Sequence, residues 1–386
     1  MKLQKSKADQ LAQEHGTPLY VYDQAYLTNR ASILLEHCRK HNFLIRYAIK
    51  ANPHPEIVKL FNDIGLAFDA SSSYEAEYLI DQGVEPAKIS LSSQQPAENL
   101  KQLLDLGVKY VATSLHQLAL VEKTGWSGNI AVRLNPGIGA GHSNRTNTGG
   151  LAASFGIWHE YVQQVLAWQT SSNCTIDRLH LHIGSGGDPA IWRQTIKTAL
   201  ELVGQMPDVT TLDIGGGYKV ARMPDEQEAD MAKILNEFSQ ELEKFKKDTG
   251  RSINLEIEPG TWLVASGGVL LSRIADIVDT GKDGYKFIKL DTGMNDFMRP
   301  TLYGAQHPIE VLNDSNDTED YVVVGHNCES GDILTPMSGE PELIATRQLK
   351  KAQIGDLVVI GGAGAYAASM RAIGYNHFPA AQEVFI

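Results

Sequence analysis

Short apolar runs alternate with amphipathic segments along the first two thirds of the chain. Each of eight runs ends in small or polar residues, and a segment with apolar residues at helical spacing usually follows. The predicted strands cover residues 44–50, 66–72, 89–93, 110–114, 130–136, 178–185, 210–217 and 254–260. Eight strands that alternate with helices predict an α/β fold in which a parallel sheet closes into a (β/α)8 TIM-like barrel.

The pattern changes after about residue 265. Runs such as VLLSRIADIVDTG, YKFIKLDTG and GDLVVIGGAG are strand-like and are separated by Gly and Asp turns, with little helix between them. They predict a second, mainly antiparallel β domain, which the early segment TPLYVYD (17–23) could join. We therefore expect a barrel over residues 24–265 and a β domain over residues 1–23 and 266–386.

Composition and charge restrict the class of protein. The 386 residues are 42% hydrophobic and carry a net charge of −12, which disfavours nucleic-acid and anionic-membrane partners. Residues 1–16 lack the apolar core of a secretory signal, and no run approaches the ~18 apolar residues of a membrane span. Three widely spaced cysteines (Cys38, Cys174, Cys328) exclude a disulfide framework or a zinc site of paired cysteines. We expect a cytoplasmic protein.

One glycine-rich motif suggests a dinucleotide-binding loop. LVVIGGAGAYAA (357–368) follows a predicted strand and loosely matches G-x-G-x-x-A. That fingerprint requires a βαβ unit and an acidic residue about 20 positions further on. After Gly364 only 22 residues remain, which is too few for another helix and strand. We therefore reject a Rossmann interpretation.

Chemically distinctive residues lie at the ends of the predicted barrel strands, where barrel enzymes place their functional groups. They are Lys50, Asp69, His182, Ser185, Gly215, Gly216, Gly217, Glu258 and Gly260. A lysine amine can form a Schiff base with an aldehyde, glycine N–H groups can bind a phosphate, and a carboxylate can keep a pyridine nitrogen protonated. Together these groups predict a pyridoxal 5'-phosphate (PLP) site.

Each of these residues also has a structural explanation. A lysine at a strand end commonly extends its amine to the surface, the glycine runs could be plain turns, and Glu258 could cap the segment after it. The joint placement at four strand ends favours the cofactor site.

The motifs YAIKANP, FDASS, LNPGIGAGH, HLHIGSGG, DIGGGY, EIEPG, MRPTLYGAQHPI, CESGD and GAYAASM extend over nearly the whole chain. Through them the sequence resembles the fold III PLP-dependent decarboxylases, and within these the diaminopimelate decarboxylases. The resemblance implies an alanine-racemase-like pairing of barrel and β domain. It also implies a head-to-tail homodimer with shared active sites, no metal, and decarboxylation of a small amino acid, meso-2,6-diaminopimelate, to L-lysine.

The resemblance also implies roles for individual residues. Lys50 would bind the cofactor aldehyde, His182 would stack on its ring, and Glu258 would hold its nitrogen. The phosphate would lie near Ser185, Gly215, Gly216, Gly217, Gly260 and Tyr366. Arg299 and Tyr303 would receive the distal carboxylate of the substrate, with Tyr366 beside them. From the neighbouring subunit, Glu329 would bind the distal amino group and Cys328 would help to protonate the product, although CESGD could equally be a plain strand end.

The sequence departs from the family pattern in the segment EPGTWLVA. Thr261 stands where the family has an arginine, Ser154 replaces a usual lysine, and Ser73-Tyr74 replace a common Gly-Gly. Arg145, in the loop 136–150, could compensate for the lost cation. The alternatives are a decarboxylase for another amino acid or a diamino-acid conjugate, an amino-acid racemase, and a non-catalytic PLP-binding protein.

Overall fold

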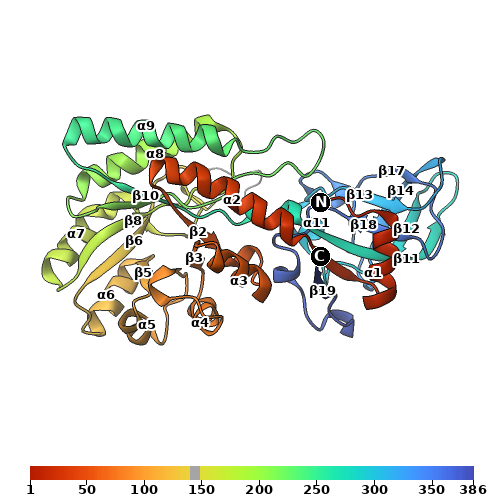
Figure 1. The fold of residues 1–386 in the computed structure, drawn as a ribbon, viewed down its shortest axis with the longest axis horizontal. Helices are drawn as coiled ribbons and strands as arrows, with labels where there is room; N and C mark the ends of the chain where they lie inside the picture. The colour runs from red at the N-terminus through yellow and green to blue at the C-terminus, as the bar shows by residue number, and fades with distance from the viewer. Residues whose placement is uncertain (140–147) are drawn as a thin grey trace. The chain divides into compact units, whose positions relative to one another are not determined.

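The computed structural model describes residues 1–139 and 148–386, which form two compact units (Figure 1). The barrel unit comprises Arg30–Lys219 and Glu228–Gly260. The β unit comprises Met1–Asn29, Val220–Gln227 and Thr261–Ile386. The divisions after Asn29 and Gly260 lie a few residues from the boundaries expected from the sequence. The segment Val220–Gln227 folds with the β unit, which the pattern of strands and helices did not indicate.

The barrel unit contains the predicted closed parallel barrel. Its strands are β2 Leu44–Ala48, β3 Ala67–Ala70, β4 Ile89–Ser92, β5 Lys109–Ala112, β6 Asn129–Asn135, β8 Thr175–His180, β9 Thr211–Asp213 and β10 Asn254–Ile257. They pair in parallel in the order β5-β4-β3-β2-β10-β9-β8-β6, and pairing of β5 with β6 closes the ring. The short strand β7 Ile157–Trp158 pairs with the end of β6. The (β/α)8 prediction is confirmed.

Helices surround these strands, and side-chain caps fix where several of them begin (Figure 1). They are α2 Gln24–His41, α3 Pro55–Asp63, α4 Ser73–Asp81, α5 Leu100–Leu106, α6 Leu115–Lys123, α7 Val162–Ser171, α8 Pro189–Gln205 and α9 Met231–Thr249, with 3-10 turns at Ile49–Ala51, Pro86–Lys88 and His159–Tyr161. The hydroxyls of Ser72 and Ser114 accept hydrogen bonds from the N–H groups of Glu75 and Gln117. Such N-caps satisfy backbone N–H groups that the first helical turn leaves unpaired. They fix the starts of α4 and α6 shortly after the preceding strands.

The β unit contains the predicted, mainly antiparallel sheet. Its strands are β1 Leu19–Tyr22, β11 Gly268–Asp279, β12 Lys286–Leu290, β13 Ile309–Leu312, β14 Thr318–Val324, β17 Arg347–Lys350, β18 Leu357–Ile360 and β19 Gln382–Phe385, with a separate hairpin of β15 Pro336–Met337 and β16 Glu340–Ile344. The helices are α1 Lys5–His15, α10 Thr261–Val264 and α11 Arg299–Tyr303, and 3-10 turns lie at Ala265–Gly267, Ala368–Met370 and Tyr375–His377. The early strand β1 pairs with β11, as expected from TPLYVYD.

A cluster of apolar side chains joins α1 to the sheet of the β unit. Ala8, Leu11 and Ala12 of the helix are buried against residues of β1, β11 and β18, including Leu19 and Leu271. The spacing of the three helical residues places them on one face, so burial of this face docks the helix.

The glycine-rich segment after β18 is explained by close backbone packing. A Cβ atom on Gly364 would lie 1.9 Å from the carbonyl oxygen of Val264, and one on Gly268 would lie 2.5 Å from the Cα atom of Gly364. The next regular element is the three-residue turn Ala368–Met370, so no βαβ unit follows β18. This agrees with the rejection of a dinucleotide-binding loop.

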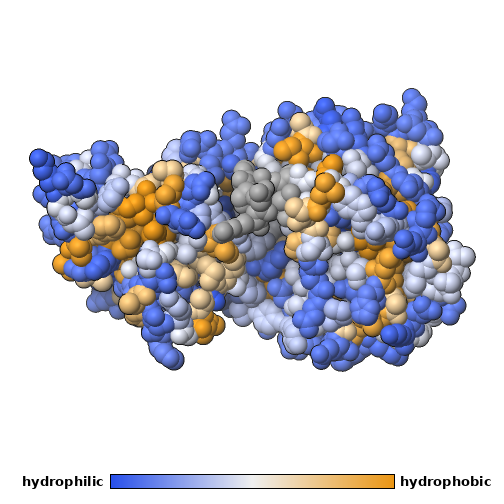
Figure 2. Space-filling view, turned by 180° about the vertical axis from the view of Figure 1, so that it is seen from behind, coloured by the Kyte–Doolittle hydropathy of each residue, from blue (hydrophilic) through white to orange (hydrophobic). Residues whose placement is uncertain are grey.

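Figure 2 shows apolar patches within a largely polar surface. The most exposed large apolar residues include Leu151, Ile373 and Ile354. Within the described residues, no helix combines the length and apolarity needed to cross a membrane.

Candidate active site

Lys50 lies in the 3-10 turn directly after β2, not in the strand itself. Its Nζ atom donates a hydrogen bond to Ser71 Oγ at 3.0 Å and lies 3.4 Å from Asp69 Oδ2. The carboxylate of Asp69 is buried and its Oδ1 atom has no partner among the described residues. The Lys50 side chain is 39% exposed, so its amine is accessible to a small molecule. The nearby carboxylate of Asp69 favours the charged form of this amine.

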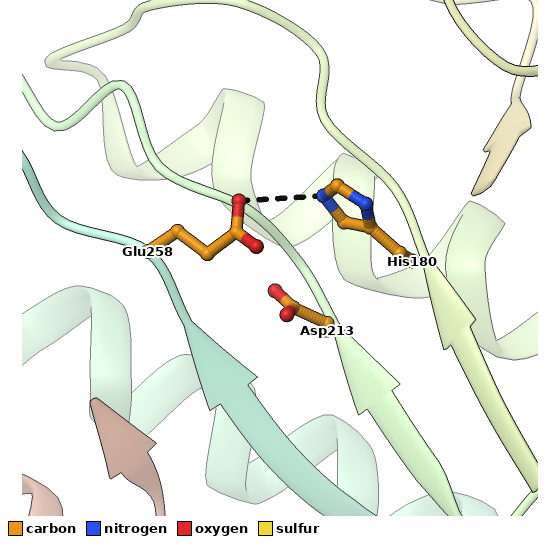
Figure 3. A group of neighbouring side chains, drawn as sticks. All are labelled: His180, Asp213 and Glu258. Atoms are coloured by element: carbon orange, nitrogen blue, oxygen red, sulfur yellow. Dashed lines mark ion pairs between the residues drawn. The ribbon is translucent and has the colours of Figure 1, made fainter. Parts of the chain in front are cut away.

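Three buried side chains converge at the ends of β8, β9 and β10 (Figure 3). Glu258 Oε2 lies 3.3 Å from His180 Nε2, and Asp213 completes the group. Burial, and then the charge of Asp69, raises the pKa of Glu258 to about 7. Burial, and then Glu258, raises the pKa of Asp213 to about 8, while burial lowers the pKa of His180 to about 4. At neutral pH Asp213 therefore retains its proton, Glu258 is about half protonated, and the imidazole beside them is neutral.

Arginine side chains bind the carboxylates deeper in the barrel. Arg46 forms a bidentate ion pair with Glu256, with distances of 2.7 and 2.8 Å. Arg178 lies 3.3 Å from Glu256 and 3.5 Å from Asp213, and donates a hydrogen bond to Ser90. Burial alone would raise the pKa of Glu256, but Arg178 and Arg46 outweigh burial and lower this pKa to about 2.

His182 lies just beyond β8 and is held by the glycine run that follows β9. The N–H of Gly216 donates to His182 Nδ1 at 3.3 Å, which leaves the ring proton on Nε2. Burial lowers the pKa of His182 well below its usual value. A Cβ atom on Gly215 would lie 2.6 Å from the same Nδ1 atom, so the imidazole position requires glycine there.

The glycine-containing loops of the barrel unit pack directly against one another. A Cβ atom on Gly216 would lie 2.0 Å from the carbonyl oxygen of Glu258, and one on Gly217 would lie 1.8 Å from that of Gly184. Gly217 also has a φ of +100°, which favours glycine. A Cβ atom on Gly260 would lie 3.0 Å from Ala51 Cβ. Backbone without side chains is therefore concentrated at the ends of β8, β9 and β10, and Ser185 lies partly exposed in the loop after β8.

The β unit contains the remaining predicted site residues. Arg299 begins α11, its Nε donates to His307 Nε2 at 3.3 Å, and its Cζ atom lies 5.8 Å from the ring centre of Tyr303. Tyr366 has a φ of +53°, a left-handed conformation that is rare for a bulky residue and common at functional positions.

Cys328 and Glu329 are both exposed at the surface of the β unit. The N–H of Cys328 donates to Asn376 Oδ1 at 2.7 Å, and the hydroxyl of Tyr375 donates to Glu329 Oε2 at 3.1 Å. Hydrogen bonds from the N–H of Gly331 and from Tyr375 lower the pKa of Glu329. Two side chains suited to proton transfer and amine binding are thus accessible on one loop.

The barrel residues fit PLP on structural grounds. An accessible amine, a half-buried imidazole and a set of closely packed glycine loops lie at the ends of neighbouring strands β2, β10, β9 and β8. Glu258 Oε1 and Arg133 Nη2 are buried polar atoms without hydrogen-bond partners in the described chain. A bound pyridine nitrogen would give Glu258 Oε1 a hydrogen-bond partner.

His180, Asp213 and Glu258 also present three ligand atoms within 4.8 Å of one another. Arg178 lies 3.5 Å from Asp213, and the positive charge of Arg133 reaches both carboxyl groups. Two cations beside the group oppose a divalent metal ion by charge repulsion.

Comparison with known proteins identifies the family. Residues 28–265 match the model of the pyridoxal-dependent decarboxylase family, pyridoxal binding domain. The chain belongs to this family. Its cofactor is PLP, as the strand-end residues predicted.

The matches to relatives of this decarboxylase extend over both units of the chain. The diaminopimelate decarboxylase of Streptomyces coelicolor is 34% identical over 97% of this chain and 86% of its own length. A crystal structure of a diaminopimelate decarboxylase matches with a TM-score of 0.90 and 29% identity, over 99% of this chain and 92% of that one. The Helicobacter pylori diaminopimelate decarboxylase complexed with L-lysine matches with a TM-score of 0.86 and 27% identity, over 98% and 93% of the two chains. These matches confirm the predicted fold and the resemblance.

Arg178, His180 and Glu256 of the barrel site carried no prediction. Arg178 and His180 alternate with the predicted His182 along RLHLHI, and Glu256 alternates with the predicted Glu258 along LEIEPG. Alternate residues of a strand share one face, so this pattern of polar residues was the available signal for a polar barrel interior. Arg145 lies outside the described residues.

Proposed function

We propose that this decarboxylase converts meso-2,6-diaminopimelate to L-lysine and CO2. The observation that carries this proposal is the group at the barrel strand ends: an accessible Lys50 amine, a buried Glu258 with an unpaired oxygen, and glycine loops free of side chains. The substrate follows from relatives that are named diaminopimelate decarboxylases and align over almost the whole chain.

When bound, PLP supplies an aldehyde for a Schiff base and a ring that accepts the electron pair left by the departing CO2. Lys50 would provide the amine that holds the cofactor. Glu258, close to its partners Asp213 and His180, stabilises the proton on the pyridine nitrogen. His182 would orient the ring, and Ser185, Gly215–Gly217, Gly260 and Tyr366 would bind the phosphate or lie beside it.

In the β unit, Arg299 and Tyr303 bind the distal carboxylate of the substrate, with Tyr366 next to them. Glu329 binds the distal amino group, since hydrogen bonds from Gly331 and Tyr375 favour its charged form. Cys328 delivers the proton that replaces CO2, and its exposure allows it to approach a substrate.

We further propose a head-to-tail homodimer with shared active sites. Support comes from the exposure of Cys328 and Glu329, because residues that act in a neighbouring subunit must lie at the surface of their own chain. The other two cysteines, Cys38 and Cys174, are buried and unpaired, which fits a reducing compartment, and we place the enzyme in the cytoplasm.

A second candidate is decarboxylation of another amino acid or of a diamino-acid conjugate. Thr261 motivates it, because threonine offers a neutral hydroxyl where the family has a guanidinium. Ser154 is another replaced position, and its hydroxyl accepts a hydrogen bond from Gln94 at 3.2 Å.

The deciding experiment measures CO2 release and lysine formation by the PLP-loaded protein with meso-diaminopimelate, L-lysine and L-ornithine as substrates. Stoichiometric CO2 and lysine from meso-diaminopimelate alone supports the proposal. Turnover of another amino acid only would establish the second candidate. No CO2 from any of the three substrates, with the cofactor bound, would contradict decarboxylation of diaminopimelate, lysine and ornithine and would favour a non-catalytic PLP-binding protein.

A further inference from the structure

Two arginines of the β unit lie near enough for their charges to repel each other. Arg222 lies in the segment Val220–Gln227 and Arg299 begins α11. Arg222 Nε donates to the carbonyl oxygen of Gly362 at 3.3 Å, whereas its Nη2 atom is buried and has no hydrogen-bond partner. In residues 1–139 and 148–386, no carboxylate forms an ion pair within 4 Å of either guanidinium.

The neighbouring groups do not neutralise this pair of cations. Burial, and then the charge of Arg299, lowers the pKa of Arg222 to about 9. His307 Nδ1 lies 2.9 Å from the carbonyl oxygen of Gly361 and so carries the ring proton, which leaves Nε2 to accept from Arg299. Burial, Arg222 and Arg299 all lower the pKa of His307, so this imidazole is neutral and adds no charge.

Glu226 is the acidic residue whose charge reaches both arginines. Its Oε2 atom accepts hydrogen bonds from the backbone N–H groups of Arg222 and Met223, at 2.8 and 3.0 Å. This carboxylate therefore holds the backbone turn around Arg222 and forms no ion pair with the guanidinium. Two half-buried cations whose charges repel each other are unfavourable, and an anionic ligand would reduce this penalty.

We propose that Arg222 is a specificity-determining residue that binds the distal carboxylate of the substrate together with Arg299. The inference rests on the proposed function and extends it. Arg222 supplies a second guanidinium in a chain that has Thr261 where the family has an arginine. A carboxylate can accept hydrogen bonds from two guanidinium groups at once, which selects substrates with a carboxylate at the end remote from the reaction.

The binding test compares two compounds that differ only in this carboxylate. L-Lysine retains the distal carboxylate of meso-diaminopimelate, and cadaverine is the same chain without it. Calorimetric titration of the PLP-loaded enzyme should show that Arg222→Gln weakens L-lysine binding about 10-fold or more and leaves cadaverine binding within about 2-fold. Arg222→Lys, which keeps the charge but loses the planar fork, should restore part of the L-lysine affinity.

Two controls separate ligand binding from a structural role. Arg273→Gln also removes a guanidinium that donates to a backbone carbonyl, that of Gly355, and should leave L-lysine binding unchanged. Because Arg222 is unneutralised, the ligand-free Arg222→Gln variant should unfold at the same temperature as the wild type or higher. A lower unfolding temperature together with equal loss of L-lysine and cadaverine binding would assign Arg222 a structural role and overturn the inference.

A further probe does not depend on the identity of the substrate. Glutarate, a dicarboxylate without amines, should raise the unfolding temperature of the PLP-loaded wild type and not that of Arg222→Gln. If this holds while the wild type fails to convert meso-diaminopimelate, the proposed function fails and the carboxylate site stands. If meso-diaminopimelate is converted but Arg222→Gln binds L-lysine and glutarate as the wild type does, the inference fails. Loss of PLP from Arg222→Gln with an unchanged preference for L-lysine over cadaverine would also overturn it, by assigning Arg222 to the phosphate.

Discussion

Glu256 and Glu258 are two residues apart at the end of β10, yet they have opposite electrostatic environments. Arg46 and Arg178 both contact Glu256 and lower its pKa to about 2. Glu258 contacts the neutral His180, and burial raises its pKa to about 7. The position of the guanidinium groups therefore decides which inward-facing carboxylate is a permanent structural anion and which can exchange a proton with a ligand.

Proton uptake by Glu258 and Asp213 should make the cofactor-free protein pH-sensitive. Both pKa values are higher in the folded protein than in the unfolded chain, so the folded state holds extra protons and stability falls as pH rises toward about 8. The pKa of His180 is lowered to about 4, which has the opposite effect on stability. Below about pH 6.5 the unfolded chain holds the extra proton, so this histidine makes stability rise with pH. Between pH 6.5 and 8, we expect the carboxyl pair to remove up to about 2 kcal/mol of stability.

The Asp213→Asn variant isolates this contribution. Asparagine retains an oxygen that can accept the N–H of Gly215, as Asp213 Oδ1 does at 3.0 Å, but it cannot titrate. Thermal unfolding of the cofactor-free protein between pH 6.5 and 8 should show a smaller loss of stability in the variant than in the wild type. The charges around the pair, on Arg178, Arg133, Asp69 and Lys50, are the same in both proteins. Equal pH dependence would show that the carboxyls do not hold the extra protons.

Replacement of Lys50 should abolish the covalent attachment of PLP. We expect Lys50→Ala to lose the visible absorbance of the lysine-bound cofactor and to reduce decarboxylation by on the order of 10³-fold or more. The control is Lys59→Ala, which removes an exposed lysine paired with Asp63 on α3. Absorbance spectra before and after borohydride treatment provide the measurement. A cofactor that borohydride still attaches to the Lys50→Ala protein would place the Schiff base on another lysine.

At the scale of elements, the glycine run after β9 is where sequence and structure are most tightly linked. Gly216→Ala would place a Cβ atom 2.0 Å from the carbonyl oxygen of Glu258, so one of the two backbone segments must move. We expect a loss of about 1–3 kcal/mol in stability and weaker PLP binding. The matched control is Gly204→Ala in α8, where a Cβ atom meets nothing within 4 Å and alanine should stabilise the helix by about 0.5–1 kcal/mol.

Thermal unfolding with and without PLP distinguishes the two substitutions. If Gly216→Ala is as stable as Gly204→Ala and binds PLP equally well, the close packing of the loops after β9 and β10 is not required for the site.

The elements with strong apolar periodicity were predictable from the sequence. All eight barrel strands and the long helix α9 follow from it, because burial on one or both faces imposes a regular pattern. Predicted strands continued too far at their carboxyl ends: β8 ends at His180, whereas the sequence suggested residue 185. Small and polar residues continue the strand pattern there, but the backbone turns to form the loops that hold the site.

Contacts between distant segments could not be predicted in the same way. Positions at strand ends indicated Lys50 and Glu258, since the barrel fold gathers such positions on one rim. The segment Val220–Gln227 has no periodicity, and its assignment to the β unit depends on contacts such as that of Arg222 with Gly362. Arg222 therefore emerged only from the folded structure.

At the scale of the whole molecule, the exposure of Cys328 and Glu329 raises the question of where they act. In a head-to-tail dimer, each active site would combine the barrel of one subunit with the Cys328 loop of the other. A direct test inactivates the barrel in one chain and the Cys328 loop in another chain, and then mixes the two proteins. A mixed dimer has one site with both defects and one site with none.

Lys50→Ala and Cys328→Ala should each be nearly inactive and should recover activity when mixed. After complete subunit exchange at equal concentrations, half of the dimers are mixed and half of their sites are intact, so about a quarter of wild-type activity is expected. Lys50→Ala mixed with Glu258→Gln is the matched control: both residues belong to the barrel unit, so every site in a mixed dimer has one defect and activity should not return. Decarboxylation assays should accompany native mass spectrometry to show the exchange. Demonstrated exchange without recovery would mean that Cys328 acts within its own chain, because only a site built from two subunits is restored by mixing.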